Sequence, residues 1–310
     1  MGKRSLGAKG SLAGLAVILL TWSTLATASA IHSWRDDQGR LHFGDRPPAD
    51  VATEDLSDRY RHELPFQLSI KGIDYQVPPE LHDLIALHIT RIFHIYRQTL
   101  SVEYRPDQDF DIYLYGDADT FKSYQQQLAP HLKNVIGFYN MQDNRISALA
   151  TDNIRQLLNV LIHEASHAVT LSNGHMVPLW LNEGLAEYFA NMHVFGLTAE
   201  IRPARHWLNM TRALAFDIER LEVLLDASPD VWHQLDRGVG QSYGPSWSLA
   251  YFLMSSEQGR DLIQSLLDAS AEDQFVRSTS LIEQDWPGGL AAFHEQWQKW
   301  LQNSPAPHRY

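Results

Sequence analysis

Two histidines and a glutamate lie close together in an otherwise apolar stretch of the sequence. Residues 161–170 read LIHEASHAVT, with His163 and His167 four residues apart and Glu164 beside the first histidine. On a helix this spacing places both imidazoles on one face, a turn apart, so their ring nitrogens can converge on one metal ion. Glu164 lies about a hundred degrees further round the helix, where it would reach past the ion instead of binding it. Zinc hydrolases use this spacing.

A second apolar stretch supplies two more carboxylates. Residues 178–192 read PLWLNEGLAEYFANM, a predicted helix in which Pro178 fits the first turn and Glu183 and Glu187 are four residues apart. Unpaired carboxylates in an apolar helix would cost several kcal/mol, so both need partners, and a zinc ion with its histidines would satisfy them. Because the chain contains 15 histidines, His-Glu-x-x-His could arise by chance with a probability of roughly a few per cent. The second helix is therefore what favours a metal site.

HEASH followed by NEGLAE resembles the gluzincin zinc peptidases, most closely the small peptidase MA-like group and more distantly the thermolysin and neutral aminopeptidase families. The resemblance spans about residues 66–270 and implies that Glu183 is the third zinc ligand, after His163 and His167. Fifteen residues separate His167 from Glu183, fewer than in the larger relatives. The loop between the two helices must therefore differ from theirs.

Two further roles follow for carboxylates around the ion. Glu164 would take a proton from water and later pass it to the leaving amine. Glu187, one helical turn after Glu183, would hydrogen-bond a liganding histidine, in the first instance His163, and fix its tautomer.

A third stretch, QSYGPSWSLAYFLM at residues 241–254, resembles the segment of neutral aminopeptidase relatives in which a tyrosine precedes a helix and donates to the developing oxyanion. This resemblance makes Tyr243 a candidate catalytic residue. The alternative is that Tyr243 only caps and packs the helix. Trp247, in the same helix, is interpreted as a core residue.

Other kinds of site are excluded or disfavoured. A metzincin would need glycine at position 170 and histidine at position 173, where this chain has Thr170 and Asn173. The chain has no cysteine, so it can form neither a disulfide framework nor a thiolate site, and any metal must be held by nitrogen and oxygen. His175, His193 and His206 are interpreted as loop or surface residues without a role.

Strands and helices that could position these residues are predicted from hydrophobic periodicity. The motif helix is apolar nearly all round and therefore buried, with Thr151 or Asp152 as its N-cap and Asn173-Gly174 as its stop. The elements predicted before it are a strand in 66–77, a helix opened by Pro78-Pro79, a strand in 109–116, a short helix near 118–128, and strands in 135–140 and 145–150. Beyond Gly196 the pattern is helical with loops.

This order of strands first and helices later predicts an α+β fold and not a doubly wound sheet. The resemblance implies a zincin-like, minimal gluzincin domain. It would have a small N-terminal sheet, an active-site helix pair and a helical C-terminal part.

Residues 1–30 have the features of a secretory signal peptide: three basic residues, an apolar run from 12 to about 25, and Ala28-Ser29-Ala30 before a cleavage site. The alternative is an uncleaved membrane anchor, since 12–28 is near the lower length limit for a span. Removing the three basic residues from the total of 25 leaves 22 against 37 acidic residues, a formal charge of −15. This balance argues against nucleic acid or an anionic membrane surface as a partner.

Residues 31–50, IHSWRDDQGRLHFGDRPPAD, predict a small N-terminal hairpin domain with a turn at Asp37-Gln38-Gly39. Its Trp-x-Asp, Gly and Phe-x-Asp-x-Pro-Pro pattern resembles a small domain of unknown function found in exported bacterial proteins. The alternative is an edge hairpin packed on the main domain. Residues 51–65 are predicted to be a linker, and 66–304 the gluzincin-like peptidase domain.

The sequence thus predicts a zinc hydrolase that cleaves peptide bonds, with one zinc per chain and a peptide or protein substrate. The strand pair around Phe138 and Ile146 could offer an edge to which an extended peptide adds, as in related peptidases. Endopeptidase, exopeptidase and cell-wall peptide cleavage are all compatible with the motif.

Two alternatives belong to other functional classes. One is a zinc-stabilised, non-catalytic binding or assembly factor of the cell envelope, which Glu164 disfavours because a structural zinc site needs no base. The other is a membrane-tethered scaffold with an uncleaved leader. The expected compartment is the periplasm, with secretion or membrane anchoring as alternatives.

Overall fold

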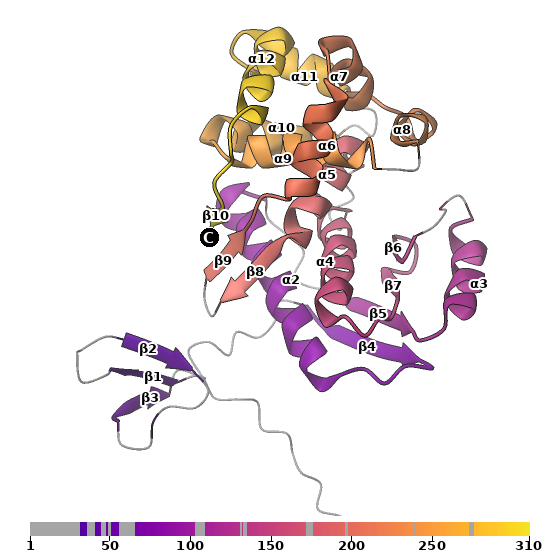
Figure 1. Cartoon of the computed structure of the whole chain (residues 1–310), viewed down its shortest axis with the longest axis vertical. Helices are drawn as coiled ribbons and strands as arrows, with labels where there is room; N and C mark the ends of the chain where they lie inside the picture. The colour runs from indigo at the N-terminus through magenta and orange to yellow at the C-terminus, as the bar shows by residue number, and fades with distance from the viewer. Residues whose placement is uncertain are drawn as a thin grey trace, which may run out of the picture. The chain divides into compact units, whose positions relative to one another are not determined.

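The computed structural model divides the chain into two compact units, Met1–Arg61 and His62–Tyr310 (Figure 1). It describes residues 32–35, 41–44, 48, 51–55, 66–102, 109–130, 132, 135–171, 176–195, 198–237, 240–272 and 276–310. Within these residues the chain forms eleven helices and three small sheets. The fold is α+β, as the sequence predicts. Over the same described residues, no helix combines the length and apolar character needed to cross a bilayer.

The first unit contains a three-stranded antiparallel sheet of order β2-β1-β3. Strands β1 (His32–Arg35) and β2 (Leu41–Gly44) pair from His32↔Gly44 to Arg35↔Leu41, which is the hairpin arrangement predicted for residues 31–50. The predicted turn and the predicted leader lie outside the described residues. Strand β3 (Thr53–Asp55) pairs with the other edge of β1. The sheet therefore extends into the segment that the sequence analysis assigned to a linker.

The second unit begins with a four-stranded sheet of order β4-β5-β7-β6. Strands β4 (Leu68–Ile73), β5 (Phe110–Tyr115) and β7 (Arg145–Leu149) are parallel, and β6 (Gly137–Asn140) runs antiparallel to β7 at the edge. All four strands fall where the sequence predicts them: apolar and polar residues alternate in β5, and a polar turn at 142–144 separates β6 from β7.

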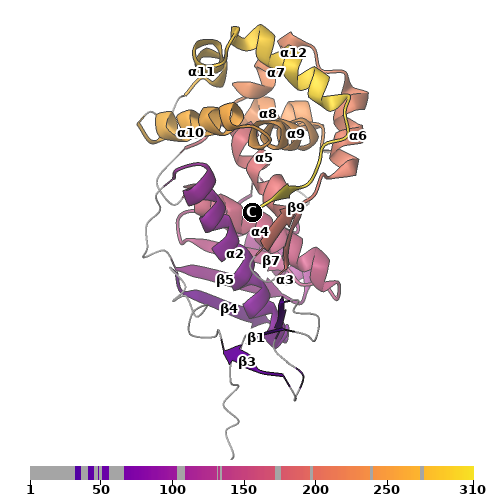
Figure 2. The same ribbon diagram turned by 90° about the vertical axis from the view of Figure 1, so that its left-hand side faces the viewer.

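Helices cover the two faces of this sheet unequally. On one face Ile112, Leu114 and Ile146 join the main core with α2 (Pro79–Thr99), which runs alongside the sheet in Figure 2, and with the helix that carries the two motif histidines. On the other face Tyr115 and Phe138 form a smaller cluster with α3 (Ala118–Leu128). The sequence predicts both α2 and α3 close to these bounds.

Helices α4 (Ile154–Leu171) and α5 (Leu179–Ala190) carry the candidate residues and lie between the sheet and the later helices (Figure 1). The side chain of Asn153 accepts a hydrogen bond from the backbone N–H of Gln156 at 3.1 Å, which makes Asn153 the N-cap of α4. The prediction of Thr151 or Asp152 as the cap is therefore wrong. Thr151 instead accepts from the N–H of Asn153 at 3.3 Å.

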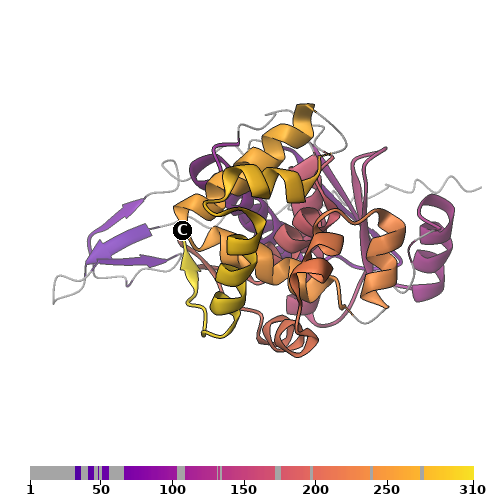
Figure 3. The same ribbon diagram turned by 90° about the horizontal axis from the view of Figure 1, so that it is seen from above.

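The C-terminal part is mostly helical, as predicted, and Figure 3 shows its orange to yellow helices grouped together. Its helices are α6 (Arg205–Leu214), α7 (Ile218–Leu225), α8 (Pro229–Asp236), α9 (Tyr243–Met254), α10 (Glu257–Glu272), α11 (Ser278–Asp285) and α12 (Gly289–Leu301). Helix α9 is apolar nearly all round and packs against α5. A helix of this kind is stable only in the interior of a unit.

A second antiparallel sheet, of order β10-β9-β8, was not predicted. Strands β8 (Met192–Phe195) and β9 (Thr198–Ile201) form a hairpin directly after α5, and β10 (His308–Arg309) pairs with β9. Strand β8 follows the apolar run of α5 without a break, and the sequence analysis assigned the residues beyond Gly196 to helices and loops. Strand β10 also lies beyond residue 304, where the sequence analysis ends the domain.

The segment around β10 is held against α5 by buried polar groups. The hydroxyl of Tyr188, on α5, lies 2.8 Å from Nδ1 of His308 and 2.6 Å from the hydroxyl of Tyr310. The backbone N–H of Tyr310 donates to the carbonyl of Ala199 at 2.9 Å. Burial, with a further contribution from the charge of Arg260, lowers the pKa of His308 to about 4.

We expect His308 to make the stability of the protein depend on pH. Its pKa is lower in the folded chain than in the unfolded chain, where it is about 6.5. Between these values the unfolded chain binds the extra proton, so stability is lost as pH falls from about 6.5 towards 4. Urea unfolding with chelator present should show that His308→Gln removes about 1–2 kcal/mol of the wild-type loss between pH 7 and pH 5. The control His82→Gln changes an exposed histidine and should keep the wild-type slope. Equal slopes for all three proteins would contradict the expectation.

Candidate metal centre

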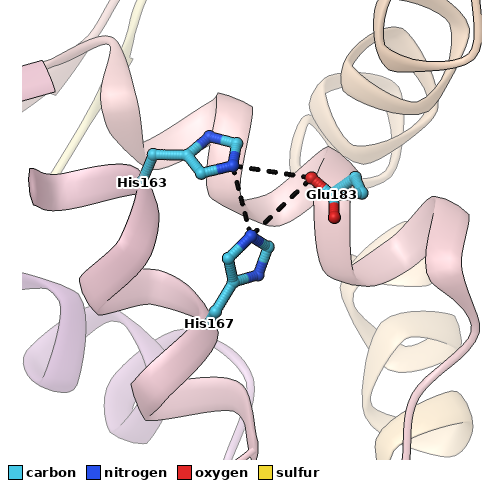
Figure 4. Close-up of side chains that lie close together, drawn as sticks. All are labelled: His163, His167 and Glu183. Atoms are coloured by element: carbon cyan, nitrogen blue, oxygen red, sulfur yellow. Dashed lines mark hydrogen bonds and ion pairs between the residues drawn. The ribbon is translucent and has the colours of Figure 1, made fainter. Parts of the chain in front are cut away.

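Helix α4 places the two motif histidines side by side. Nε2 of His163 and Nε2 of His167 are 3.2 Å apart, and the two rings meet edge to face with centroids at 4.8 Å (Figure 4). Their side chains are only 16% and 10% exposed. Residues four apart lie one above the other on a helix, so the pairing follows directly from the sequence spacing.

Helix α5 brings Glu183 to the same point. Its Oε2 lies 3.5 Å from Nε2 of His163 and 3.7 Å from Nε2 of His167 (Figure 4). In the part of the chain that the structure describes, these three residues are the one group of three histidine or acidic side chains with ligand atoms within 4.8 Å of one another. The structure therefore brings together the three ligands expected from the sequence.

These three atoms fit a tetrahedral metal ion. Atoms bound at about 2.0–2.2 Å to a tetrahedral zinc lie about 3.3–3.6 Å apart, close to the spacings of 3.2, 3.5 and 3.7 Å found here. Nδ1 of His163 faces Oε1 of Glu187 at 3.4 Å. With a metal ion bound, Nδ1 would carry the proton and Nε2 would turn its lone pair to the ion. Without an ion, a protonated His163 can donate to both Glu183 and Glu187.

Neighbouring groups shift the pKa values of the charged residues in the site. Burial alone would lower the pKa of His163, but hydrogen bonds to Glu183 and Glu187 raise it well above its usual value. Burial alone would raise the pKa of both Glu183 and Glu187. The two histidines outweigh burial at Glu183 and lower its pKa. His163 and Trp207 do the same at Glu187. Both carboxylates therefore remain ionised, and the site attracts positive charge.

Glu164 lies beside the group without belonging to it. Burial, the largest influence, raises its pKa, while the two neighbouring histidines lower it. The backbone N–H of Tyr139, on edge strand β6, donates a hydrogen bond to it. A Cβ atom at Gly137 would lie 2.5 Å from Cγ1 of Val160 and 3.4 Å from Oε1 of Glu164. Glycine at position 137 therefore leaves room for Val160, one turn before this carboxylate on α4.

Tyr243 is the first residue of α9 and lies close enough to the site to feel its charge. The charge of Glu183 is the largest cause of its raised pKa, followed by burial and by Asp236. The approach of α9 to α5 depends on Gly184, where a Cβ atom would lie 2.4 Å from the carbonyl oxygen of Ser246. The glycine of the Asn-Glu-Gly sequence is thus needed for helix packing, next to the residue that could bind metal.

Two other histidines with no predicted role lie outside the group. His193 stacks on Phe195 at 6.3 Å and contacts Arg155 at 3.2 Å, and His206 packs beside Trp207. His175 is outside the described residues. Trp247 is fully buried, in agreement with its interpretation as a core residue.

Sequence analysis did not identify Trp207, which donates from its indole N–H to Oε2 of Glu187 at 2.8 Å. It lies twenty residues along the chain from Glu187 and on another helix. A tryptophan on an amphipathic helix is ordinarily a packing residue, so the sequence carries no signal for this contact.

Comparison with known proteins bears on the first unit alone. Residues 18–61 match a family described as Domain of unknown function (DUF4124). This match agrees with the resemblance noted for residues 31–50 and extends it to residue 61, the end of the first compact unit. It includes none of the residues of the candidate metal centre. A search of curated proteins found no match.

Glu183→Ala should remove most of the zinc that the purified protein is expected to carry, about one ion per chain, because two histidines alone hold zinc weakly. Elemental analysis after dialysis measures the change. Glu219→Ala, which removes an exposed carboxylate from α7, is the matched control and should retain the ion. Full zinc retention by Glu183→Ala would show that Glu183 is not a ligand.

Proposed function

We propose that the protein is a zinc-dependent peptidase of the gluzincin type. The observation that supports this most is the convergence of His163, His167 and Glu183 on one point, with the carboxylate of Glu164 buried beside them. A structural zinc site would normally close with a fourth protein ligand. Here three ligands converge among the described residues, and a potential base lies next to them.

The ligand His163 has a partner that holds it for this task. Glu187 accepts from Nδ1 of His163 and so fixes which ring nitrogen faces the ion. When bound, zinc would supply Lewis acidity, which polarises a carbonyl oxygen and lowers the pKa of water towards about 7. Glu164 accepts the proton of the attacking water and delivers it to the leaving amine. Its hydrogen bond from Tyr139 keeps the carboxylate beside the strand edge.

Tyr243 is the proposed donor to the oxyanion. The negative charge of Glu183, the largest influence on its hydroxyl, keeps that hydroxyl protonated, so it can donate as charge develops on the substrate oxygen. Its ring lies between two tryptophans, with Trp207 nearly parallel at 6.5 Å and Trp232 edge-on at 5.6 Å. A donor held in this way loses little freedom when the reaction occurs.

Strand β6 is the proposed binding edge for an extended peptide. The N–H of Leu149 donates to the carbonyl of Ile136, and β6 pairs with β7 in antiparallel register. In this alternation Gly137 and Tyr139 direct their backbone groups away from β7, towards the free edge. A peptide added there would pass Glu164, which is already bonded to the N–H of Tyr139. We propose peptides or proteins as substrates, and the formal charge of −12 disfavours nucleic acid.

The place of action proposed for this chain is outside the cytoplasm. The signal-like residues 1–30 support this proposal. A non-catalytic zinc-stabilised binding factor is the second candidate. Glu164 speaks against it, since burying an extra carboxylate beside three ligands has a cost that a structural site does not require.

Glu164→Gln separates chemistry from metal binding. The amide keeps the shape of the side chain and cannot accept a proton, so peptide hydrolysis should fall by a factor on the order of a hundred or more. Zinc content and melting temperature should stay close to those of the wild type. Cleavage of a peptide library, followed by mass spectrometry, is the measurement. Equal cleavage by both proteins would mean that Glu164 is not the base, and a wild type that cleaves no peptide would favour the binding factor.

Tyr243→Phe tests the oxyanion donor. The ring that packs between the tryptophans is kept, so kcat should fall about ten- to a thousandfold with little change in KM. Tyr251→Phe is the control on the same helix, because the hydroxyl of Tyr251 donates to the carbonyls of Ile201 and Ala306 and not into the site. That variant should lower the melting temperature and leave kcat unchanged. A loss of stability with unchanged kcat in Tyr243→Phe would make Tyr243 a packing residue.

A further inference from the structure

Trp207 contacts two parts of the candidate site, the carboxylate of Glu187 and the ring of Tyr243. Its indole N–H donates to Oε2 of Glu187 at 2.8 Å, while Oε1 of the same carboxylate faces Nδ1 of His163 at 3.4 Å. The two oxygens of Glu187 are therefore divided between a ligand and a tryptophan. Because an indole N–H can only donate, the bond favours the ionised carboxylate and fixes the plane in which it lies.

The face of the same indole packs on Tyr243. The two rings are nearly parallel, with an interplanar angle of 18° and centroids 6.5 Å apart. Trp232 meets Tyr243 from another direction, edge-on, at 5.6 Å. Trp207 is therefore the residue of this aromatic group that touches both the proposed oxyanion donor and the carboxylate behind the metal ligand.

Two glycines make room for the indole. A Cβ atom at Gly240 would lie 2.7 Å from Cζ3 of Trp207, and one at Gly244 would lie 3.3 Å from Cε3. Gly240 also has φ +81°, a conformation that residues with side chains rarely adopt. The hydroxyl of Thr211 donates to the carbonyl of Trp207 at 2.8 Å, one turn along α6. The indole is thus confined to one position.

We propose that Trp207 is a positioning residue that fixes the positions of both Glu187 and Tyr243. Zinc affinity and oxyanion stabilisation would then depend on one side chain. The proposal rests on the proposed function, since it assigns Trp207 a role in that site. It also makes a statement about binding that does not depend on turnover. The contact with Glu187 acts on the metal ligand, and the stacking contact acts on the catalytic hydroxyl.

A zinc titration in competition with a chelator tests the contact between Trp207 and Glu187. Trp207→Phe keeps an aromatic ring and loses the N–H, so zinc affinity should fall about three- to tenfold. Glu187→Gln should lower it about ten- to a hundredfold. The double variant should bind zinc no more weakly than Glu187→Gln alone, because the indole acts through that carboxylate. Trp232→Phe, which also removes an indole from contact with Tyr243, should keep the wild-type affinity.

Gly240→Ala tests the contacts with Glu187 and Tyr243 at once, because the added methyl group displaces the indole. At saturating zinc it should lower kcat about ten- to a hundredfold with KM nearly unchanged, and it should also weaken zinc binding. Circular dichroism of each zinc-free variant checks that it is folded. Should Trp207→Phe not fold, the titration of Gly240→Ala decides whether the indole supports zinc binding through Glu187.

Unchanged zinc affinity in Trp207→Phe, or losses that simply add in the double variant, would overturn the proposal and make Trp207 a packing residue. A wild type that binds zinc but cleaves nothing would overturn the proposed function, while the titration would still decide the link between Trp207 and Glu187. A wild type that binds no zinc would overturn both.

Discussion

Burying Glu183 and Glu187 between two apolar helices is possible because the histidines of α4 lie within contact distance of both. Each carboxylate would cost several kcal/mol without a partner of opposite charge. His163 serves the two at once, through Nε2 and Nδ1. This double contact fixes the rotation of α4 and α5 about their axes, since turning either helix would separate the imidazole from one carboxylate. The packing of the whole unit has to respect that alignment.

Close packing around α5 then determines what else can reach the site. Gly184 lets α9 come within contact distance of the α5 backbone, which brings Tyr243 towards Glu183. Gly137 likewise lets strand β6 pack against Val160 of α4, one turn before Glu164. A side chain at either position would have to displace a neighbouring group. Small residues beside large ones are therefore a packing requirement of this fold, because packed interiors leave little room to compensate.

Contacts within one helix could be predicted from periodicity, and contacts between helices only where a buried charge needed a partner. His163 and His167 share a face through helical periodicity alone, and Glu183 was found because a carboxylate in an apolar stretch needs a partner. Trp207 was missed because nothing in its own neighbourhood distinguishes it from a packing residue. The β8–β9 hairpin was missed because its first strand continues the apolar run of α5 without a break. The cap at Asn153 was misplaced because Thr151, Asp152 and Asn153 are all good capping residues.

The bond between Tyr188 and His308 joins residues 120 positions apart. Tyr188 is fully buried in the folded unit, and its hydroxyl gains His308 and Tyr310 as partners only when that distant strand docks. A chain that is made from its N-terminus onward exposes α5 long before β10 exists. The helix that carries Glu183 therefore completes its hydrogen bonding late in folding. A nascent chain would carry α5 through much of its synthesis before the C-terminal strand that anchors this helix exists.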